Sequence, residues 1–269
     1  PPQWKLQVLL GLYGTDIRGR ISRRRFKSVK KWCKAMRLST AFIEDFKHRH
    51  AVILGMTRSG KTFLAGKILQ GIQELGGHTI FVDPKHDDGY AHLGTICHSP
   101  IEVYEQLLRK NPAIIFRTPG TSEERIEALD RMVELMFTLQ RTPGFKRIRR
   151  VIAIDEIQLF VKKGNSRAVE TIWTIGAGIG IVGMALTQRI QLLNETAWSQ
   201  SDNKVIFKIE DRVDYLKSRN LEHYINELEF FKDSMNRYWF YYTRGGGRWK
   251  KHEPIPLVDP KKNLDLSRF

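Results

Sequence analysis

The residues with the clearest chemical potential lie between Gly55 and Thr62, where the sequence reads GMTRSGKT. A short apolar run at 51–54 precedes them, and apolar residues recur at helical spacing after them. A strand, a loop of the form GxxxxGK[ST] and a helix, in that order, make a phosphate-binding loop. The glycines let backbone N–H groups converge on phosphate oxygens, and the helix N-terminus adds unpaired donors and a favourable dipole. We therefore predict a nucleotide-phosphate site here.

Side chains of the same loop have distinct expected roles. Lys61 is expected to reach the β- and γ-phosphates, and the Thr62 hydroxyl is expected to bind Mg²⁺. Arg58 stands in the middle of the loop, where small residues are common, and either contacts the nucleotide or points to solvent. Phe63 packs near the nucleotide or in the core. The predicted nucleotide-binding residues are Gly55, Met56, Thr57, Arg58, Ser59, Gly60, Lys61, Thr62 and Phe63.

Two acids, Asp155 and Glu156, follow a second apolar strand at 151–154. This places them at the C-terminal edge of the expected sheet, where ligands of such sheets bind. Asp155 is expected to hold Mg²⁺, and Glu156 to accept a proton from, or orient, the attacking water. Gln188 ends another strand and can hydrogen-bond the γ-phosphate or that water. We predict Lys61, Glu156 and Gln188 as catalytic residues, and Thr62 and Asp155 as metal ligands.

Strands and helices alternate along the chain, which indicates an α/β fold with a mostly parallel central sheet flanked by helices. Gly76 and Gly77 form a good end for the helix that follows the loop. The predicted strands are 51–54, 78–82, 113–117, 151–154, 181–186, 204–209 and 237–243, and the predicted helices are 60–75, 100–110, about 18 residues from Ser122, 166–180 and 215–231.

The net charge of +16 favours a polyanionic partner, with nucleic acid first and an anionic membrane surface second. Residues 1–50 carry 13 basic and 3 acidic side chains, and therefore +10 of that charge. We predict a basic N-terminal arm or small subdomain at 1–47 and an ATPase domain at 48–269. The arm contacts phosphates or packs on the core through Trp32 and Met36. The candidate DNA contacts are Arg23, Arg24, Arg25, Lys30, Lys31, Arg248, Lys250 and Lys251, the last three in a basic segment that a surface hairpin would also explain.

Other classes find little support in the sequence. Cys33 and Cys97 provide no disulfide framework, which indicates a reducing compartment. No apolar run approaches the ~20 residues that span a membrane, and no secretory signal is visible. The polar residues from His86 to His98 have no familiar zinc-ligand spacing, so a polar loop is the better interpretation.

The motif order GMTRSGKT, IFVDPK, VIAIDE, MALTQR and KVIFKI resembles the FtsK/HerA superfamily of DNA-pumping ATPases. The small size is similar to that of genome-packaging ATPases of tailless, membrane-containing viruses. This resemblance implies a RecA-like P-loop NTPase core, ATP and Mg²⁺ as cofactors, and a homo-oligomeric ring, usually hexameric, around double-stranded DNA. It also implies a cytoplasmic location (the host cytoplasm for a virus), with association of this protein with the virion vertex or an inner membrane, and a portal or membrane-vertex protein as a partner. No small-molecule substrate beyond the nucleotide is expected.

In such rings an arginine finger from the neighbouring subunit normally neutralises the negative charge that develops on the phosphate during hydrolysis. Some relatives carry this arginine at a position that Ala177 occupies here. Arg189, Arg167 and Lys204 are the candidate substitutes.

Two alternative functions remain open at this stage. A conjugation or secretion ATPase uses the same motor, although such proteins usually carry membrane helices or large insertions. A nucleotide-switched DNA- or membrane-binding protein would dock through the basic arm without translocating. Glu156 argues against the switch, because a pure switch has little use for an activated water.

Overall fold

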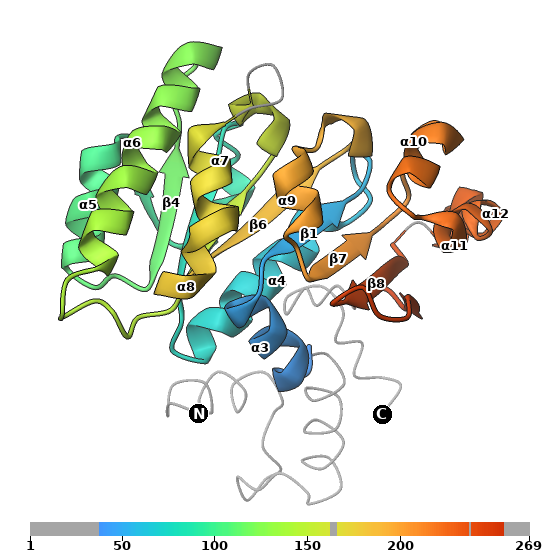
Figure 1. The fold of residues 1–269 in the computed structure, drawn as a ribbon, viewed down its shortest axis with the longest axis horizontal. Coiled ribbons are helices and arrows are strands. Elements are labelled where there is room, and N and C mark those ends of the chain that lie inside the picture. Colours follow the sequence, from blue (N-terminus) through green and yellow to red (C-terminus); the bar gives the residue numbers. More distant parts are fainter. Residues whose placement is uncertain (1–37, 162–165, 237, 256–269) are drawn as a thin grey trace, which may run out of the picture. The chain divides into compact units, whose positions relative to one another are not determined.

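The computed structural model describes residues 38–161, 166–236 and 238–255, and its central feature is a twisted sheet (Figure 1). In these ranges the sheet has nine strands in the order β3-β4-β2-β5-β6-β1-β7-β8-β9. The strands are β1 (Ala51–Leu54), β2 (His78–Asp83), β3 (Thr95–Cys97), β4 (Ala113–Arg117), β5 (Arg150–Ile154), β6 (Ile181–Thr187), β7 (Asn203–Ile206), β8 (Phe240–Arg244) and β9 (Lys250–His252).

The pairing of the strands brings the ends of the predicted motifs together. Every pair from β3 to β7 is parallel, whereas β8 and β9 continue the sheet as antiparallel strands. Strand β1 lies between β6 and β7, with Leu54 opposite Thr187. Strand β2 pairs with β5, with Val82 opposite Ile154. The C-terminal ends of β1, β2, β5 and β6 therefore meet at one edge of the sheet.

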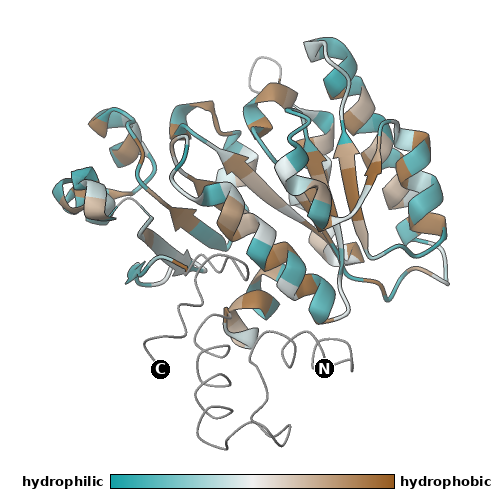
Figure 2. Ribbon diagram, turned by 180° about the vertical axis from the view of Figure 1, so that it is seen from behind, coloured by the Kyte–Doolittle hydropathy of each residue, from teal (hydrophilic) through white to brown (hydrophobic). Residues whose placement is uncertain are grey.

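Both faces of the sheet are buried, as expected for parallel strands. Successive residues of β1 alternate between two apolar clusters: Val52 and Leu54 enter the cluster beneath α5, α6, α7 and α9, and Ala51 and Ile53 enter the one beneath α3 and α4. Figure 2 shows the apolar strands between more polar helices. The helices are α3 (Thr40–His48), α4 (Lys61–Glu74), α5 (Pro100–Leu108), α6 (Ser122–Gln140), α7 (Arg167–Thr171), α8 (Ala177–Ile179), α9 (Glu195–Ser199), α10 (Val213–Ser218), α11 (Glu222–Ile225) and α12 (Leu228–Lys232).

The predicted fold class is confirmed. The end of α4 shows how a local sequence signal, the pair Gly76 and Gly77, predicts where a helix ends. Gly76 has φ 73, the left-handed conformation that glycine adopts without strain. Its N–H donates to the Gln73 carbonyl at 3.0 Å, while the Gly77 N–H donates to the Ile72 carbonyl at 2.9 Å. These two bonds are those of a Schellman motif, which satisfies the last carbonyls of the helix.

The prediction of a single helix over 215–231 is wrong, because the structure has three short helices there, α10 to α12. Asn220 has φ 57, which a continuous helix does not allow. The predicted helix at 166–180 is present, but Ile172–Gly176 winds as a π-helix between α7 and α8. Close contact explains the glycine there, since a Cβ on Gly176 would lie 2.7 Å from the Ile181 carbonyl oxygen. The short strands β3 and β9 were not predicted.

The range assigned from sequence to the N-terminal arm has one described element. Residues Leu38–Ile255 form one compact unit, and α3 lies within it, with Ile43 and Phe46 buried against the α4 side of the sheet. The remainder of the arm lies outside the described residues. None of the helices in the described ranges has the length and apolar character needed to cross a bilayer.

Candidate nucleotide site

The loop between β1 and α4 is tied at its base to the strands on either side. The Gly55 N–H donates to the Thr187 carbonyl at 3.1 Å, and the Met56 N–H donates to the Lys208 carbonyl at 2.8 Å. A Cβ on Gly55 would lie 2.3 Å from the hydroxyl oxygen of Ser59, so the loop closes on itself only with glycine there. The loop is therefore fixed at the edge of the sheet where the acids of β5 lie.

The tip of the loop has the backbone needed to present its N–H groups. Arg58 and Gly60 have φ values of 62 and 98, both in the left-handed region. Lys61 then begins α4, whose N-terminus has no side-chain cap from the described part of the chain, so its first N–H groups are available for an anion. Thr57 and Arg58 are exposed, and Phe63 is half-buried with Lys67 above its ring. The predicted phosphate-binding residues thus form a loop that leads directly into the first turn of α4.

Two predicted site residues from separate motifs, Lys61 and Gln188, meet at Glu156 of a third motif. The Lys61 ammonium lies 3.8 Å from Glu156 Oε1, and the Gln188 amide donates to the same oxygen at 2.6 Å. The Thr57 hydroxyl donates to Gln188 Oε1 at 3.0 Å. Gln188 therefore links the phosphate-binding loop directly to the carboxylate predicted to act on water.

Further residues that the sequence analysis did not select hold the same carboxylate. The Gln158 amide donates to Glu156 Oε2 at 2.7 Å, and its own carbonyl accepts from the Thr187 hydroxyl at 2.8 Å. The Lys85 ammonium donates to Glu156 Oε1 and lies 3.5 Å from Asp155 Oδ2. Lys85 follows β2, and the pairing of β2 with β5 brings it to Glu156. Gln158 reaches Glu156 through a turn of the 3₁₀-helix at Ile157–Phe160.

The two acids differ in their electrostatic surroundings. Burial alone would raise the pKa of Glu156, but hydrogen bonds from Lys85, Gln188 and Gln158 outweigh it and hold the pKa below its ordinary value. Burial raises the pKa of Asp155, and the nearby cations Lys85 and Lys61 only partly oppose it. Burial also lowers the pKa of Lys61. Glu156 is thus held ionised, whereas Asp155 is a buried carboxylate short of stabilising contacts.

The residues at this edge suit a magnesium ion that would accompany a nucleotide. Asp155 is 1% exposed, and neither of its carboxylate oxygens has a hydrogen-bond partner among the residues that the structure describes. Buried carboxylates normally find one. Thr62 stands in the first turn of α4 and is half-buried. One carboxylate and one hydroxyl oxygen are a donor set that fits Mg²⁺ when phosphates complete its shell.

The three candidate finger residues have different environments. Arg189 is exposed next to Gln188, and Arg167 is exposed at the start of α7. The Lys204 ammonium donates to the Ser201 carbonyl and lies 5.1 Å from the centre of the Trp198 ring. Lys204 is therefore engaged within its own chain, whereas the two arginines reach the surface.

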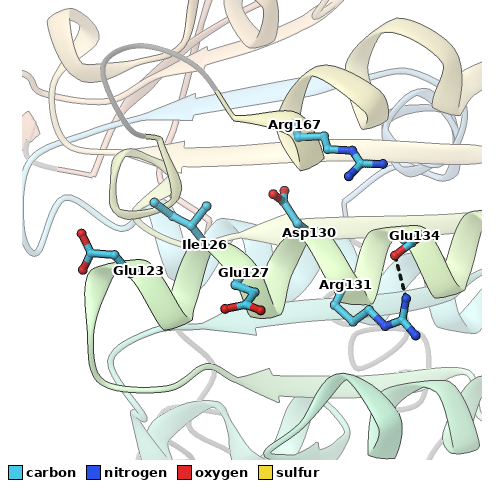
Figure 3. A pocket seen from close by; sticks show the side chains of 7 residues that line it. All are labelled: Glu123, Ile126, Glu127, Asp130, Arg131, Glu134 and Arg167. Carbon is cyan, nitrogen blue, oxygen red and sulfur yellow. Dashed lines mark hydrogen bonds and ion pairs between the residues drawn. The ribbon is translucent and has the colours of Figure 1, made fainter.

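Arg167 borders a groove that lies along α6 and contains none of the predicted nucleotide-binding residues. Figure 3 shows Asp130 pointing toward Arg167 from α6. The groove has a volume of about 570 Å³ and is lined by Glu123, Ile126, Glu127, Asp130, Arg131, Glu134 and Arg167. The Asp130 carboxylate also accepts from the Ala168 N–H at 2.8 Å, so it fixes the start of α7.

Of the candidate DNA contacts, those in the arm (Arg23, Arg24, Arg25, Lys30 and Lys31) lie outside the described residues. The C-terminal group lies on the hairpin of β8 and β9, whose turn uses Gly245 and Gly246 at φ 57 and 69. Arg248 and Lys250 are exposed there. The Lys251 ammonium is 2.6 Å from Glu227 Oε2 and 3.8 Å from the centre of the Phe230 ring.

Comparison with known proteins identifies the fold. No protein-family model matches the chain, and no curated protein sequence matches it. Among solved structures, the genome-packaging NTPase B204 of Sulfolobus turreted icosahedral virus 2, in complex with ATP-gammaS, has a TM-score of 0.64 at 16% identity, covering 78% of this chain and 99% of that chain.

Two further structures resemble the chain. VirB4 of Thermoanaerobacter pseudethanolicus has a TM-score of 0.57 at 11% identity, covering 79% of this chain and 90% of that chain. The bacterial conjugative coupling protein TrwBdeltaN70 has a TM-score of 0.55 at 11% identity, covering 80% of this chain and 87% of that chain. The chain therefore has the P-loop NTPase fold of these proteins, as its motif order predicts.

Proposed function

We propose that this protein is an ATP-hydrolysing, double-stranded DNA translocase of the FtsK/HerA type that serves as a viral genome-packaging motor. The observation that carries the proposal is the meeting of Lys61, Gln188 and Glu156, from three separate motifs: the buried Glu156 carboxylate forms an ion pair with Lys61 and accepts a hydrogen bond from Gln188. The fold shared with a genome-packaging NTPase supports the same conclusion.

In this proposal the loop and α4 bind the phosphates of ATP. The backbone N–H groups of the loop and the Lys61 ammonium contact the β- and γ-phosphates. Thr62 and Asp155 would hold Mg²⁺, which neutralises the charge that develops on the phosphate oxygens. Lys61 lies 3.8 Å from Glu156 Oε1, so a phosphate bound by the loop would compete with that carboxylate for the ammonium.

Glu156 and Gln188 have the remaining two roles, which are activation of water and sensing of the γ-phosphate. Glu156 orients the attacking water and accepts its proton, and its ionised state suits this role. Gln188 touches both Thr57 of the loop and Glu156. The loss of the γ-phosphate would disturb these two contacts together. Gln188 thus reports hydrolysis to the rest of the chain.

The motor would act as a homo-oligomeric ring, hexameric by resemblance, with duplex DNA in its pore. Arg189 and Arg167 are the preferred trans-acting fingers, because each is exposed, whereas Lys204 is engaged by Ser201. The basic arm and the exposed Arg248 and Lys250 would contact DNA phosphates. We place the motor in the host cytoplasm, docked on a portal or membrane-vertex protein.

The test is the rate of ATP hydrolysis with duplex DNA, single-stranded DNA, RNA or no nucleic acid, with Lys61→Ala as the blank. We expect strong stimulation by duplex DNA alone. An equal response to every polyanion would contradict the translocase and favour a nucleotide-switched binding protein.

A conjugation-type ATPase is the second candidate, because a bacterial conjugative coupling protein shares the fold. A preference for single-stranded over duplex DNA in the same assay would favour it. A membrane-docking role would appear as binding to anionic vesicles that requires residues 1–37.

A further inference from the structure

Lys85 is the one side chain of the described site that bridges both acids while reaching solvent. Its ammonium contacts Glu156 Oε1 and lies 3.5 Å from Asp155 Oδ2. Its side chain is 45% exposed, whereas those of Asp155 and Glu156 are 1% and 3% exposed. A partly exposed cation thus contacts both members of a buried pair of carboxylates.

The backbone on which Lys85 stands is firmly held. The fully buried Asp83 carboxylate accepts from the Lys85 N–H at 3.1 Å and from the Asp87 N–H at 2.9 Å. The next residue, His86, has φ 55, and its ring nitrogen lies 2.6 Å from the Thr118 carbonyl oxygen. The Cα position of Lys85 is therefore fixed, while its long side chain can swing out to solvent by rotation about its own bonds.

The two buried carboxylates favour a cation at this position. Neither carboxylate oxygen of Asp155 accepts a hydrogen bond among the described residues, and an isolated buried carboxylate is costly. The Lys85 ammonium supplies the missing positive charge. Mg²⁺ bound to Asp155 would supply the same charge, and two cations at one carboxylate repel each other.

We propose that Lys85 is a displaceable counter-ion that occupies the acid pair until the metal–nucleotide complex expels it. This inference rests on the proposed nucleotide site and adds a residue to it. Lys85 competes with the metal, so it sets the metal concentration at which the site becomes active. It also holds Glu156 Oε1, which keeps that oxygen from facing a water molecule until the metal arrives.

The test measures metal binding directly, without turnover. Mn²⁺ is titrated into the nucleotide-free full chain, and free Mn²⁺ is followed by electron paramagnetic resonance. We expect Lys85→Met to bind Mn²⁺ ~tenfold more tightly than the unaltered chain, because the competing charge is gone while the side-chain volume is kept. Lys85→Arg keeps the charge and should leave the affinity close to that of the unaltered chain. Asp155→Asn serves as the blank.

Lys67→Met is the matched control, since it removes one positive charge from an exposed lysine of α4 that contacts Gln70 and the Phe63 ring instead of the acids. An equal increase in Mn²⁺ affinity in Lys67→Met and Lys85→Met would mean that the loss of any nearby positive charge has this effect. That result would overturn the proposal. Unchanged, weaker or undetectable Mn²⁺ binding in Lys85→Met would overturn it as well. Thermal unfolding confirms that each variant is folded.

A fluorescent ATP analogue added to the same samples separates this inference from the proposed function. If the unaltered chain does not bind the analogue, the proposed nucleotide site fails. If it binds the analogue while Lys85→Met shows no change in Mn²⁺ affinity, only the counter-ion role fails.

Discussion

At the scale of single residues, Glu156 combines an unusual backbone with a fully engaged side chain. It has φ 46, a left-handed conformation that costs a non-glycine residue roughly 1–3 kcal/mol. This turn follows β5 directly and aims the carboxylate at Lys61, Gln188 and Gln158. Such strain persists only where surrounding contacts enforce it, which here are the contacts of the proposed catalytic site.

Replacing Glu156 by Gln should abolish turnover and preserve nucleotide binding. The amide keeps the shape but cannot accept a proton from water, so we expect kcat to fall by a factor of ~10²–10⁴. The affinity for a fluorescent ATP analogue should change little, because Lys61 and the loop bind the phosphates. Glu134→Gln, on the exposed face of α6, is the control. Undiminished turnover in Glu156→Gln would remove this residue from the mechanism.

The sequence identified the site residues that belong to contiguous motifs and missed those that depend on tertiary contacts. Lys61, Thr62, Asp155 and Gln188 follow apolar strands, so their place at the sheet edge could be inferred from local patterns. Lys85 and Gln158 reach Glu156 only through strand order and turn geometry. Asp83 was likewise recognisable as a strand end, but its role in fixing the backbone of Lys85 was not.

At the scale of secondary-structure elements, the strands of the parallel core were predictable from the sequence. The shortest strands and the short helices after β7 were not. Core strands such as β1, β5 and β6 are continuous apolar runs buried on both faces, which is a strong sequence signal. Strands β3 and β9 have three residues each, too few for a periodic pattern. The stretch 213–232 is apolar at helical spacing, but the turn at Asn220 breaks it into short helices.

His50 joins β1, β6 and the π-helix and should make stability depend on pH. Its buried ring accepts from the Gly183 N–H at 2.9 Å and stacks on Trp173 with ring centres 5.6 Å apart. Burial lowers the pKa of His50 from 6.5 to about 4, and Asp202 opposes this only partly. The folded state thus prefers the neutral ring. The associated stability is present above pH 6.5 and is lost as the pH falls toward 4.

We expect this histidine to remove as much as about 3 kcal/mol from the unfolding free energy between pH 6.5 and pH 4. Urea unfolding at several pH values in that window measures it. His50→Gln should be less stable at pH 7 but lose less stability on acidification than the unaltered chain. The matched control is His48→Gln, at an exposed histidine two residues earlier in the chain. Identical acid sensitivity in His50→Gln and the unaltered chain would contradict the assignment.

At the scale of the whole molecule, positive charge is concentrated at the N-terminus of the chain. Residues 1–37 carry eleven basic and one acidic side chain, so they hold +10 of the net +16 and leave +6 for residues 38–269. The compact unit begins at Leu38, and its proposed catalytic groups all lie after that point. Nucleic-acid affinity and ATP hydrolysis should therefore be separable by truncation.

Removal of residues 1–37 should weaken duplex binding and leave basal hydrolysis intact. Each lost phosphate contact should reduce the slope of log affinity against log salt by about 0.9, because fewer counter-ions are released on binding. Fluorescence anisotropy with a labelled duplex at several salt concentrations measures the slope, and an ATPase assay without DNA measures the basal rate. Substituting glutamine for the arginines and lysines of 18–37 provides a control that keeps the length. A basal rate that collapses in the truncated chain but survives in the glutamine variant would place the arm in the folded core or the subunit interface.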